Sequence, residues 1–246
     1  MRAGCVTLNG RMVRDPETPV RLGHDRITVD DAPVEERAKI YLAMNKPRGV
    51  VTTASDEEGR TTVYDLLPPT LALHRLTKTH DAQKEPLPAR TEWVGPVGRL
   101  DKASEGLLLL TNDSKWAAKI TDPDSHLEKR YHVQVDCVAE DDLLAWIRQG
   151  VSVGDQRLRV RAARVVRVGR KNSWLEIALD EGKNRHIRRL LAALEMSVVR
   201  LVRVSIGPLQ LGDLKKGAVR PLTDAEKELI DQALAGRGKT PISILF

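Results

Sequence analysis

Residues 98–113 limit the fold of this chain more than any other part of its sequence. They include four consecutive leucines at 107–110, a run too short to cross a membrane and typical of a buried strand. Five polar residues come shortly before that run: Arg99, Asp101, Lys102, Ser104 and Glu105. A polar loop fixed to a buried strand is what a positioned active site needs, although a loop aspartate such as Asp101 also commonly caps a turn.

Length, charge and cysteine content narrow the class of protein. A chain of 246 residues can hold one sizeable domain and a small one, and its net charge of +6 favours a polyanionic partner. Cys5 and Cys137 lie far apart and form no metal-ligand spacing, so the sequence predicts neither a disulfide framework nor a metal site. With no apolar signal region and no apolar run of membrane-spanning length, we expect a cytoplasmic protein without membrane contact, with a monomer as the default.

The segments around the leucine run resemble a known family. Residues 98–101 (GRLD), the leucine run and residues 111–113 (TND) resemble the signature loop of bacterial ribosomal-RNA pseudouridine synthases of the RsuA family. Four further stretches resemble other motifs of that family and occur in the order that the family has. These stretches are 41–53 (YLAMNKPRGVVTT), 129–135 (KRYHVQV), 181–189 (EGKNRHIRR) and 201–208 (LVRVSIGP). The resemblance covers about residues 39–221, and ordered motifs of this kind seldom coincide by chance.

The hydrophobic pattern mixes strands and helices without regular alternation, which favours an α+β fold. Strands are expected at 130–138, 157–168, 173–179 and 198–206, and helices at 114–121, 139–149, 183–195 and 223–235. The resemblance implies the pseudouridine synthase fold for residues 37–246, with a central, mostly antiparallel, curved sheet, flanking helices and a catalytic cleft.

The N-terminal residues 1–36 form a separate prediction. Asn9-Gly10 between two apolar runs predicts a tight hairpin, and Asp30-Asp31 predicts another turn. The segment resembles the strand portion of the alpha-L RNA-binding module that a small-subunit ribosomal protein shares with this family, without that module's opening helices. We therefore expect a truncated module, and we expect a flexible insertion at residues 71–93, where several prolines and no period are found.

Conversion of uridine to pseudouridine needs an unprotonated carboxylate to attack the ribose anomeric carbon, to assist proton removal or to add to ring carbon 6. The resemblance places Asp101 at the nucleophile position, Arg188 as the guanidinium that favours the charged carboxylate, and Tyr131 as the aromatic residue stacked on the base. From the pattern alone, an exposed helix arginine is not excluded for Arg188, and most tyrosines on strands, such as Tyr131, are core residues. No cofactor or metal is expected, because the reaction needs no redox change and no metal-bound water.

Other residues are expected to bind the RNA. The resemblance implies that Leu201 closes the pocket and that Arg185 contacts RNA, and Arg99 could fill the space left by an extruded base. Lys46 and Arg48 are expected to project from a loop at residues 45–49, where they bind phosphate or simply add surface charge.

The predicted partner is ribosomal RNA. Residues 182–185 (GKNR) resemble the family members that act on 23S rRNA more than those that act on 16S rRNA. Two other functions are considered: a catalytically inactive RNA-binding or ribosome-assembly factor on the same fold, and a metal-dependent nuclease that uses Asp101 with Asp113 or Glu105.

Overall fold

The structure is a computed structural model, and it describes residues 5–21, 24–34, 38–53, 56, 58–68, 71 and 93–236. The predicted insertion at 71–93 lies almost entirely outside the described residues. The chain forms two compact units, residues 1–39 and 40–246, and each is described by itself.

The first unit is a small antiparallel sheet with strand order β2-β1-β3-β4. Its strands are β1 (Val6–Leu8), β2 (Arg11–Met12), β3 (Ile27–Val29) and β4 (Ala32–Pro33). Asn9 and Gly10 both take positive φ, 52° and 81°, and so do Asp30 and Asp31, 49° and 61°. Positive φ at both central residues is what a two-residue hairpin turn needs, so the predictions of turns at these two sites are confirmed.

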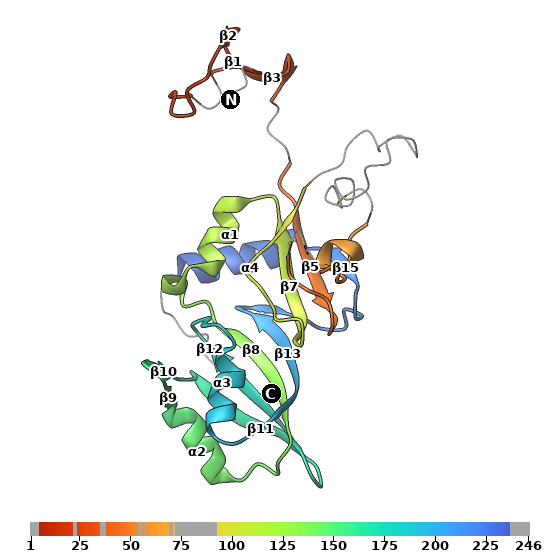
Figure 1. The fold of residues 1–246 in the computed structure, drawn as a ribbon, viewed down its shortest axis with the longest axis vertical. Coiled ribbons are helices and arrows are strands. Elements are labelled where there is room, and N and C mark those ends of the chain that lie inside the picture. Colours follow the sequence, from red (N-terminus) through yellow and green to blue (C-terminus); the bar gives the residue numbers. More distant parts are fainter. Residues whose placement is uncertain are drawn as a thin grey trace. The chain divides into compact units, whose positions relative to one another are not determined.

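The second unit is built on a nine-stranded sheet whose main strand order is β11-β12-β8-β13-β7-β5-β15 (Figure 1). The neighbouring pairs are antiparallel, apart from the parallel pair of β13 and β7, and the α+β prediction is confirmed. Its strands are β5 (Tyr41–Lys46), β6 (Gly95–Pro96), β7 (Glu105–Thr111), β8 (Lys129–Val135), β11 (Ala162–Val168), β12 (Ser173–Leu179), β13 (Val198–Ile206), β14 (Leu209–Gln210) and β15 (Val219–Pro221).

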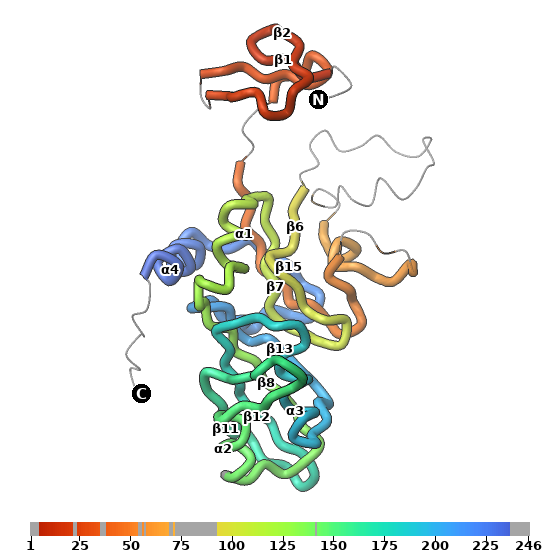
Figure 2. Tube along the Cα trace, turned by 60° about the vertical axis from the view of Figure 1, so that its left-hand side comes forward, coloured from red at the N-terminus to blue at the C-terminus, as the bar shows by residue number. Residues whose placement is uncertain are grey.

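Helices flank this sheet, and a two-stranded ribbon of β9 (Val151–Val153) and β10 (Gln156–Leu158) stands apart from it. The helices are α1 (Ser114–Thr121), α2 (Asp141–Gln149), α3 (His186–Ala193) and α4 (Asp224–Ala235), with short 3-10 turns η1 (Val63–Leu66) and η4 (Pro123–Ser125). The views in Figures 1 and 2 agree that α1 and α4 lie near the β7 and β5 end, whereas α2 and α3 lie near β8 and β12.

The leucine run forms β7, and all seven residues of this strand are buried. Leu107 and Leu109 belong to a hydrophobic cluster with residues of α1 and α4, whereas Leu108 and Leu110 belong to a second cluster with residues of η1. Successive residues of a strand point to opposite faces, so β7 is covered on both sides. The prediction of a buried strand here is confirmed.

Several predicted elements have different boundaries in the structure, and the strand expected at 130–138 already ends at Val135. The strand expected at 157–168 is divided between β10 and β11, and the fully buried Leu158 lies in the β9–β10 ribbon. The helix expected at 183–195 begins at His186, because Arg185 takes a φ of 48° that a helix does not continue.

Gly106 is required by the approach of β13 to β7. Its φ is +104°, and a Cβ atom added there would lie 2.2 Å from the carbonyl oxygen of Arg203. We expect Gly106→Ala to lower the free energy of unfolding by about 4 kcal/mol or more, because two backbones would have to separate. Gly154→Ala is the matched control: its φ is +59° with nothing within 4 Å of the added atom, so it should cost only the backbone strain, about 1 kcal/mol. Urea denaturation of both variants measures the difference, and equal losses would contradict the packing argument.

Helix α4 begins with the predicted capping box of Thr223 and Glu226. Hydrogen bonds from the Arg220 guanidinium, 2.7 and 2.6 Å long, are the main cause that lowers the pKa of Glu226 from 4.5 to about 2. Because the unfolded chain keeps the ordinary pKa, the stability that Glu226 contributes is fully present above pH 4.5 and is lost as the pH falls through about 2.

We therefore expect the wild type to lose more stability than Glu226→Gln between about pH 6 and about pH 3, as measured by urea denaturation. Glu228→Gln changes an exposed glutamate of the same helix and serves as the control. A stability difference between wild type and Glu226→Gln that is the same at both pH values would contradict this expectation.

Candidate active site

The polar loop before β7 forms one wall of a cleft of about 1000 Å³. The Asp101 side chain lies in this cleft and is 35% exposed, so a ligand can reach its carboxylate. Six of the eight predicted site residues line the cleft, and they are Arg99, Asp101, Tyr131, Arg185, Arg188 and Leu201. Segments that are far apart in the sequence therefore meet at one site.

The backbone of the loop is held by hydrogen bonds from the segment after β5. The Thr52 hydroxyl donates to the Leu100 carbonyl at 2.9 Å, and the Gly49 amide donates to the Lys102 carbonyl at 2.8 Å. Within the loop, the Ser104 amide donates to the Asp101 carbonyl at 2.9 Å. The orientation of Asp101 thus depends on fixed backbone atoms on both sides of it.

Lys46 is the largest departure from the sequence prediction. It is the last residue of β5, it is 0% exposed, and its Nζ donates to the carbonyls of Pro47 (3.2 Å), Asp101 (3.1 Å) and Ser104 (2.9 Å). The prediction that Lys46 projects from a loop toward phosphate is therefore wrong, because β5 continues to Lys46 and directs its side chain inward. Burial lowers the pKa of Lys46 to about 8, so the ammonium group is still mainly charged at neutral pH.

Arg48 differs from Lys46, because it is exposed after the strand has ended. One of its guanidinium nitrogens lies 3.4 Å from the Val199 carbonyl, to which it donates. The side chain is not part of the cleft lining, although its charge is close enough to lower the pKa of Arg188.

Two guanidinium groups surround Asp101. Arg185 Nη1 lies 3.8 Å from Asp101 Oδ2, and among the described residues this is the ion pair that Asp101 makes. Arg188, the predicted partner, instead donates to the Ala103 carbonyl at 3.0 Å and is therefore fixed to the same loop. Burial is the main cause that lowers the pKa of Arg188, and the Asp101 carboxylate opposes that shift. The helical pattern did not indicate the positive φ of Arg185, 48°, because of which the regular helix begins only at His186.

Five further cations line the cleft that were not among the predicted site residues, and they are Arg60, Lys102, Lys129, Lys183 and Arg203. Arg203 is only 6% exposed, and its Nε donates to the Leu107 carbonyl at 2.7 Å. Burial lowers the pKa of Lys129 to about 8, and the positive charge of Arg203 adds to this effect. Lys129 could have been predicted from the sequence, because it lies two residues before Tyr131 on the same strand. Residues two apart on a strand point to the same face.

Glu105 is buried and forms ion pairs with two basic residues. It is 3% exposed, receives two hydrogen bonds from Arg200 at 2.8 and 3.0 Å, and pairs with Lys216 at 2.7 Å. Burial tends to raise its pKa, but the hydrogen bonds from Arg200 and Lys216 outweigh burial and the pKa is lowered.

Within the described part of the chain, no group of three or more histidine, cysteine or acidic side chains could hold a metal ion. None of the described helices is long and apolar enough to cross a membrane.

Comparison with known proteins agrees with this geometry. The model of the RNA pseudouridylate synthase family matches residues 40–193. The ribosomal large subunit pseudouridine synthase B of Bacillus subtilis (strain 168) is 31% identical over 241 residues, which cover 97% of this chain and 90% of that protein. An uncharacterized RNA pseudouridine synthase of Aquifex aeolicus (strain VF5) is 34% identical over 224 residues, covering 91% and 82%. A crystal structure of a pseudouridylate synthase superposes with a TM-score of 0.62 at 28% identity, covering 93% of this chain and 90% of that one. The chain therefore belongs to the RNA pseudouridylate synthase family.

Proposed function

We propose that this protein isomerises a uridine of ribosomal RNA to pseudouridine, with Asp101 as the nucleophile and 23S rRNA as the favoured substrate. The observation that carries the proposal is the exposed Asp101 carboxylate, which lies in a large cleft with Arg185 3.8 Å away and Arg188 bonded to the same loop. Nearby guanidinium groups favour the charged form of a carboxylate, which is the form that the chemistry needs.

In the proposed reaction the bond between ribose C1′ and uracil N1 breaks, and a bond between C1′ and C5 forms. N1 gains a proton and C5 loses one, so the reaction is balanced without a cofactor. The Asp101 carboxylate can act in any of three ways: it can attack C1′, add to ring C6 or assist proton removal. Tyr131 and Leu201, which come from neighbouring strands and line the same cleft, are proposed to hold the detached base between them.

The remaining cleft residues are proposed to bind RNA. Arg99 lies on the cleft wall and is exposed, so it can occupy the gap left by an extruded uridine. Arg185, which lines the cleft, and Arg48, which lies outside its lining, are proposed to contact phosphate groups. The extrusion of a base costs a few kcal/mol, and such contacts offset part of that cost.

The choice of substrate rests on the relatives. Two of them, from Bacillus subtilis and from Yersinia pestis, are named ribosomal large subunit pseudouridine synthase B, which supports an rRNA substrate and favours 23S over 16S rRNA. We further propose that residues 1–36 belong to an alpha-L type RNA-binding module, that residues 37–246 are the catalytic domain, and that the protein acts as a monomer in the cytoplasm, where rRNA is made.

The proposed function is tested with rRNA that carries tritium at uracil C5, prepared from cells that lack this gene. Isomerisation releases one tritium from each converted uridine into water, and mapping of pseudouridines in rRNA from cells with and without the gene identifies the position. Release of tritium with a single lost position in 23S rRNA supports the proposal. Binding without tritium release would favour the inactive RNA-binding factor, and strand cleavage that EDTA prevents would favour the nuclease.

A further inference from the structure

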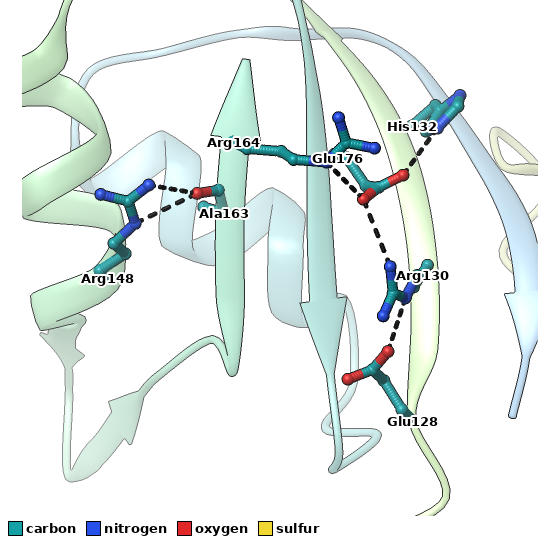
Figure 3. Close-up of polar contacts among 7 residues, drawn as sticks. All are labelled: Glu128, Arg130, His132, Arg148, Ala163, Arg164 and Glu176. Carbon is teal, nitrogen blue, oxygen red and sulfur yellow. Dashed lines mark hydrogen bonds and ion pairs between the residues drawn. The ribbon is translucent and has the colours of Figure 1, made fainter. Parts of the chain in front are cut away.

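The sheet of β11, β12, β8 and β13 has a second face on the side opposite the cleft. On β8, Lys129 and Tyr131 line the cleft, so Arg130 and His132 point to the other side (Figure 3). These outward side chains are accessible, since Arg130 is 48% exposed and His132 is 36% exposed. We call this surface the outer face, and it comprises Arg130, His132, Arg164, Arg167, Trp174, Glu176 and Arg200.

A bulge in β11 adds arginines to the outer face. Arg164 pairs with Glu176, but Arg167 pairs with Trp174 because the register shifts between Val165 and Arg167. Without the extra residue, positions three apart would point to opposite faces of the sheet. With the bulge, both arginines share the face of Glu176 and Trp174.

One carboxylate arranges the cations of this face. Glu176 has a side chain that is only 12% exposed, and its oxygens lie 2.8 Å from Arg164, 3.2 Å from His132 and 3.6 Å from Arg130. Burial tends to raise the pKa of Glu176, but the hydrogen bonds from Arg164 and His132 outweigh it and the pKa is lowered. Figure 3 shows Arg164 of β11 and Arg130 and His132 of β8 converging on this carboxylate of β12, the strand between them. Glu128 also pairs with Arg130 at 2.6 Å and Glu105 with Arg200 at 2.8 Å, but among the described residues Arg167 makes no ion pair, so the outer face keeps a positive excess.

A hollow of about 330 Å³ lies where the outer face meets the free edge of β11. It is lined by Ala162, Ala163 and Ala178, by one carboxylate, Glu176, and by four arginines: Arg130, Arg148, Arg161 and Arg164. The guanidinium of Arg148 donates twice to the Ala163 carbonyl, at 3.1 and 2.7 Å, and among the described residues it pairs with no carboxylate. Guanidinium groups bind phosphate oxygens through paired hydrogen bonds, so such a hollow suits a phosphate group.

The outer face also carries an aromatic residue. The Arg200 guanidinium lies 5.8 Å from the centre of the Trp174 ring, in the middle of the open sheet. An antiparallel sheet with arginines for phosphates and an aromatic ring for a base has the chemistry by which proteins bind single-stranded RNA. An acidic protein would need only the charges, whereas RNA would also use the partly exposed aromatic ring for a base.

We propose that the outer face is a second RNA-binding surface, which holds phosphates of the same RNA whose uridine enters the cleft. The proposal rests on the proposed function for the identity of that RNA. Because the outer face and the cleft lie on opposite sides of one sheet, a folded RNA must reach round the sheet to contact both.

The test removes two charges by the double substitution Arg164→Gln with Arg167→Gln. Glu176 keeps Arg130 and His132 as partners, so the fold should survive, which a thermal melt verifies. We expect the Kd for rRNA to rise about ten-fold, and the slope of log affinity against log salt to fall by about 1.5, since two phosphate contacts are lost. In tritium release, KM should rise in parallel while kcat stays within about two-fold, because the cleft is unchanged.

The control is Lys115→Gln with Lys119→Gln, which removes the same charge from exposed positions of α1. Loss of affinity and of salt slope in the Arg164/Arg167 variant, but not in this control, supports the proposal. An unchanged Kd and slope, or an equal loss in the control, would overturn it, as would a variant that binds naked rRNA normally and fails only with ribosomal particles, which would indicate a protein partner. The proposed function fails separately, if the wild type releases no tritium.

Discussion

Asp101→Asn abolishes turnover, with a loss of at least about 10³-fold in tritium release, while RNA affinity stays within about a few-fold. The amide has nearly the same size as the carboxylate, but it is neither a nucleophile nor a base. The backbone of residue 101 makes the hydrogen bonds to Lys46 and Ser104, so the loop should keep its conformation in the variant. Filter binding to rRNA and tritium release measure the two quantities independently.

Asp122→Asn is the control for this experiment. Asp122 lines the same cleft, and its side chain accepts a hydrogen bond from the Asp124 amide, which an asparagine can also do. We expect this variant to retain most of the wild-type turnover. Substantial activity in Asp101→Asn, or an equal loss in both variants, would refute the assignment of Asp101.

Lys46→Met has the second largest expected effect, although Lys46 does not line the cleft. The substitution removes the ammonium group that binds the carbonyls of Pro47, Asp101 and Ser104. The Asp101 carbonyl keeps the Ser104 amide as a donor, whereas those of Pro47 and Ser104 lose the donor that Lys46 supplies. An unpaired buried acceptor costs about 1 to 3 kcal/mol, so we expect the free energy of unfolding to fall by about 3 kcal/mol or more. Because the loop that carries Asp101 is released from β5, kcat should fall by about 10²-fold even at temperatures where the variant is folded.

Lys102→Met is the matched control, since Lys102 is an exposed lysine next to Asp101. Its stability should change by less than about 0.5 kcal/mol. Thermal denaturation and single-turnover tritium release distinguish the two lysines. A Lys46→Met protein with wild-type stability and kcat would show that this buried cation does not position the loop.

Much of the fold was predictable because local signals agreed with the final packing. The leucine run became β7, the Asn9-Gly10 dipeptide became a turn with two positive φ values, and the Thr223 and Glu226 pair capped α4. Each of these signals depends on residues within a few positions of one another. The resemblance to the family also predicted that Asp101, Arg188 and other residues belong to one site, and these residues line one cleft.

The environment of Lys46 was not predictable from such signals. Pro47 and Gly49 indicated a loop, but β5 continues up to Lys46, where it pairs with Gly106 of β7. Two of the carbonyls that satisfy its charge belong to residues more than fifty positions away, and no local pattern records such contacts. Which arginines share the outer face was not predictable for a related reason, because the bulge in β11 breaks the two-residue period on which strand patterns depend.

The most direct test of the account is a crystal structure of the Asp101→Asn protein with the rRNA segment that mapping identifies. We predict an extruded uridine in the cleft, against Tyr131, with its ribose C1′ or ring C6 within about 3.5 Å of the side chain of residue 101. A target uridine that remains stacked in the RNA, or that occupies another part of the protein surface, would contradict the central claim that this carboxylate acts on the base.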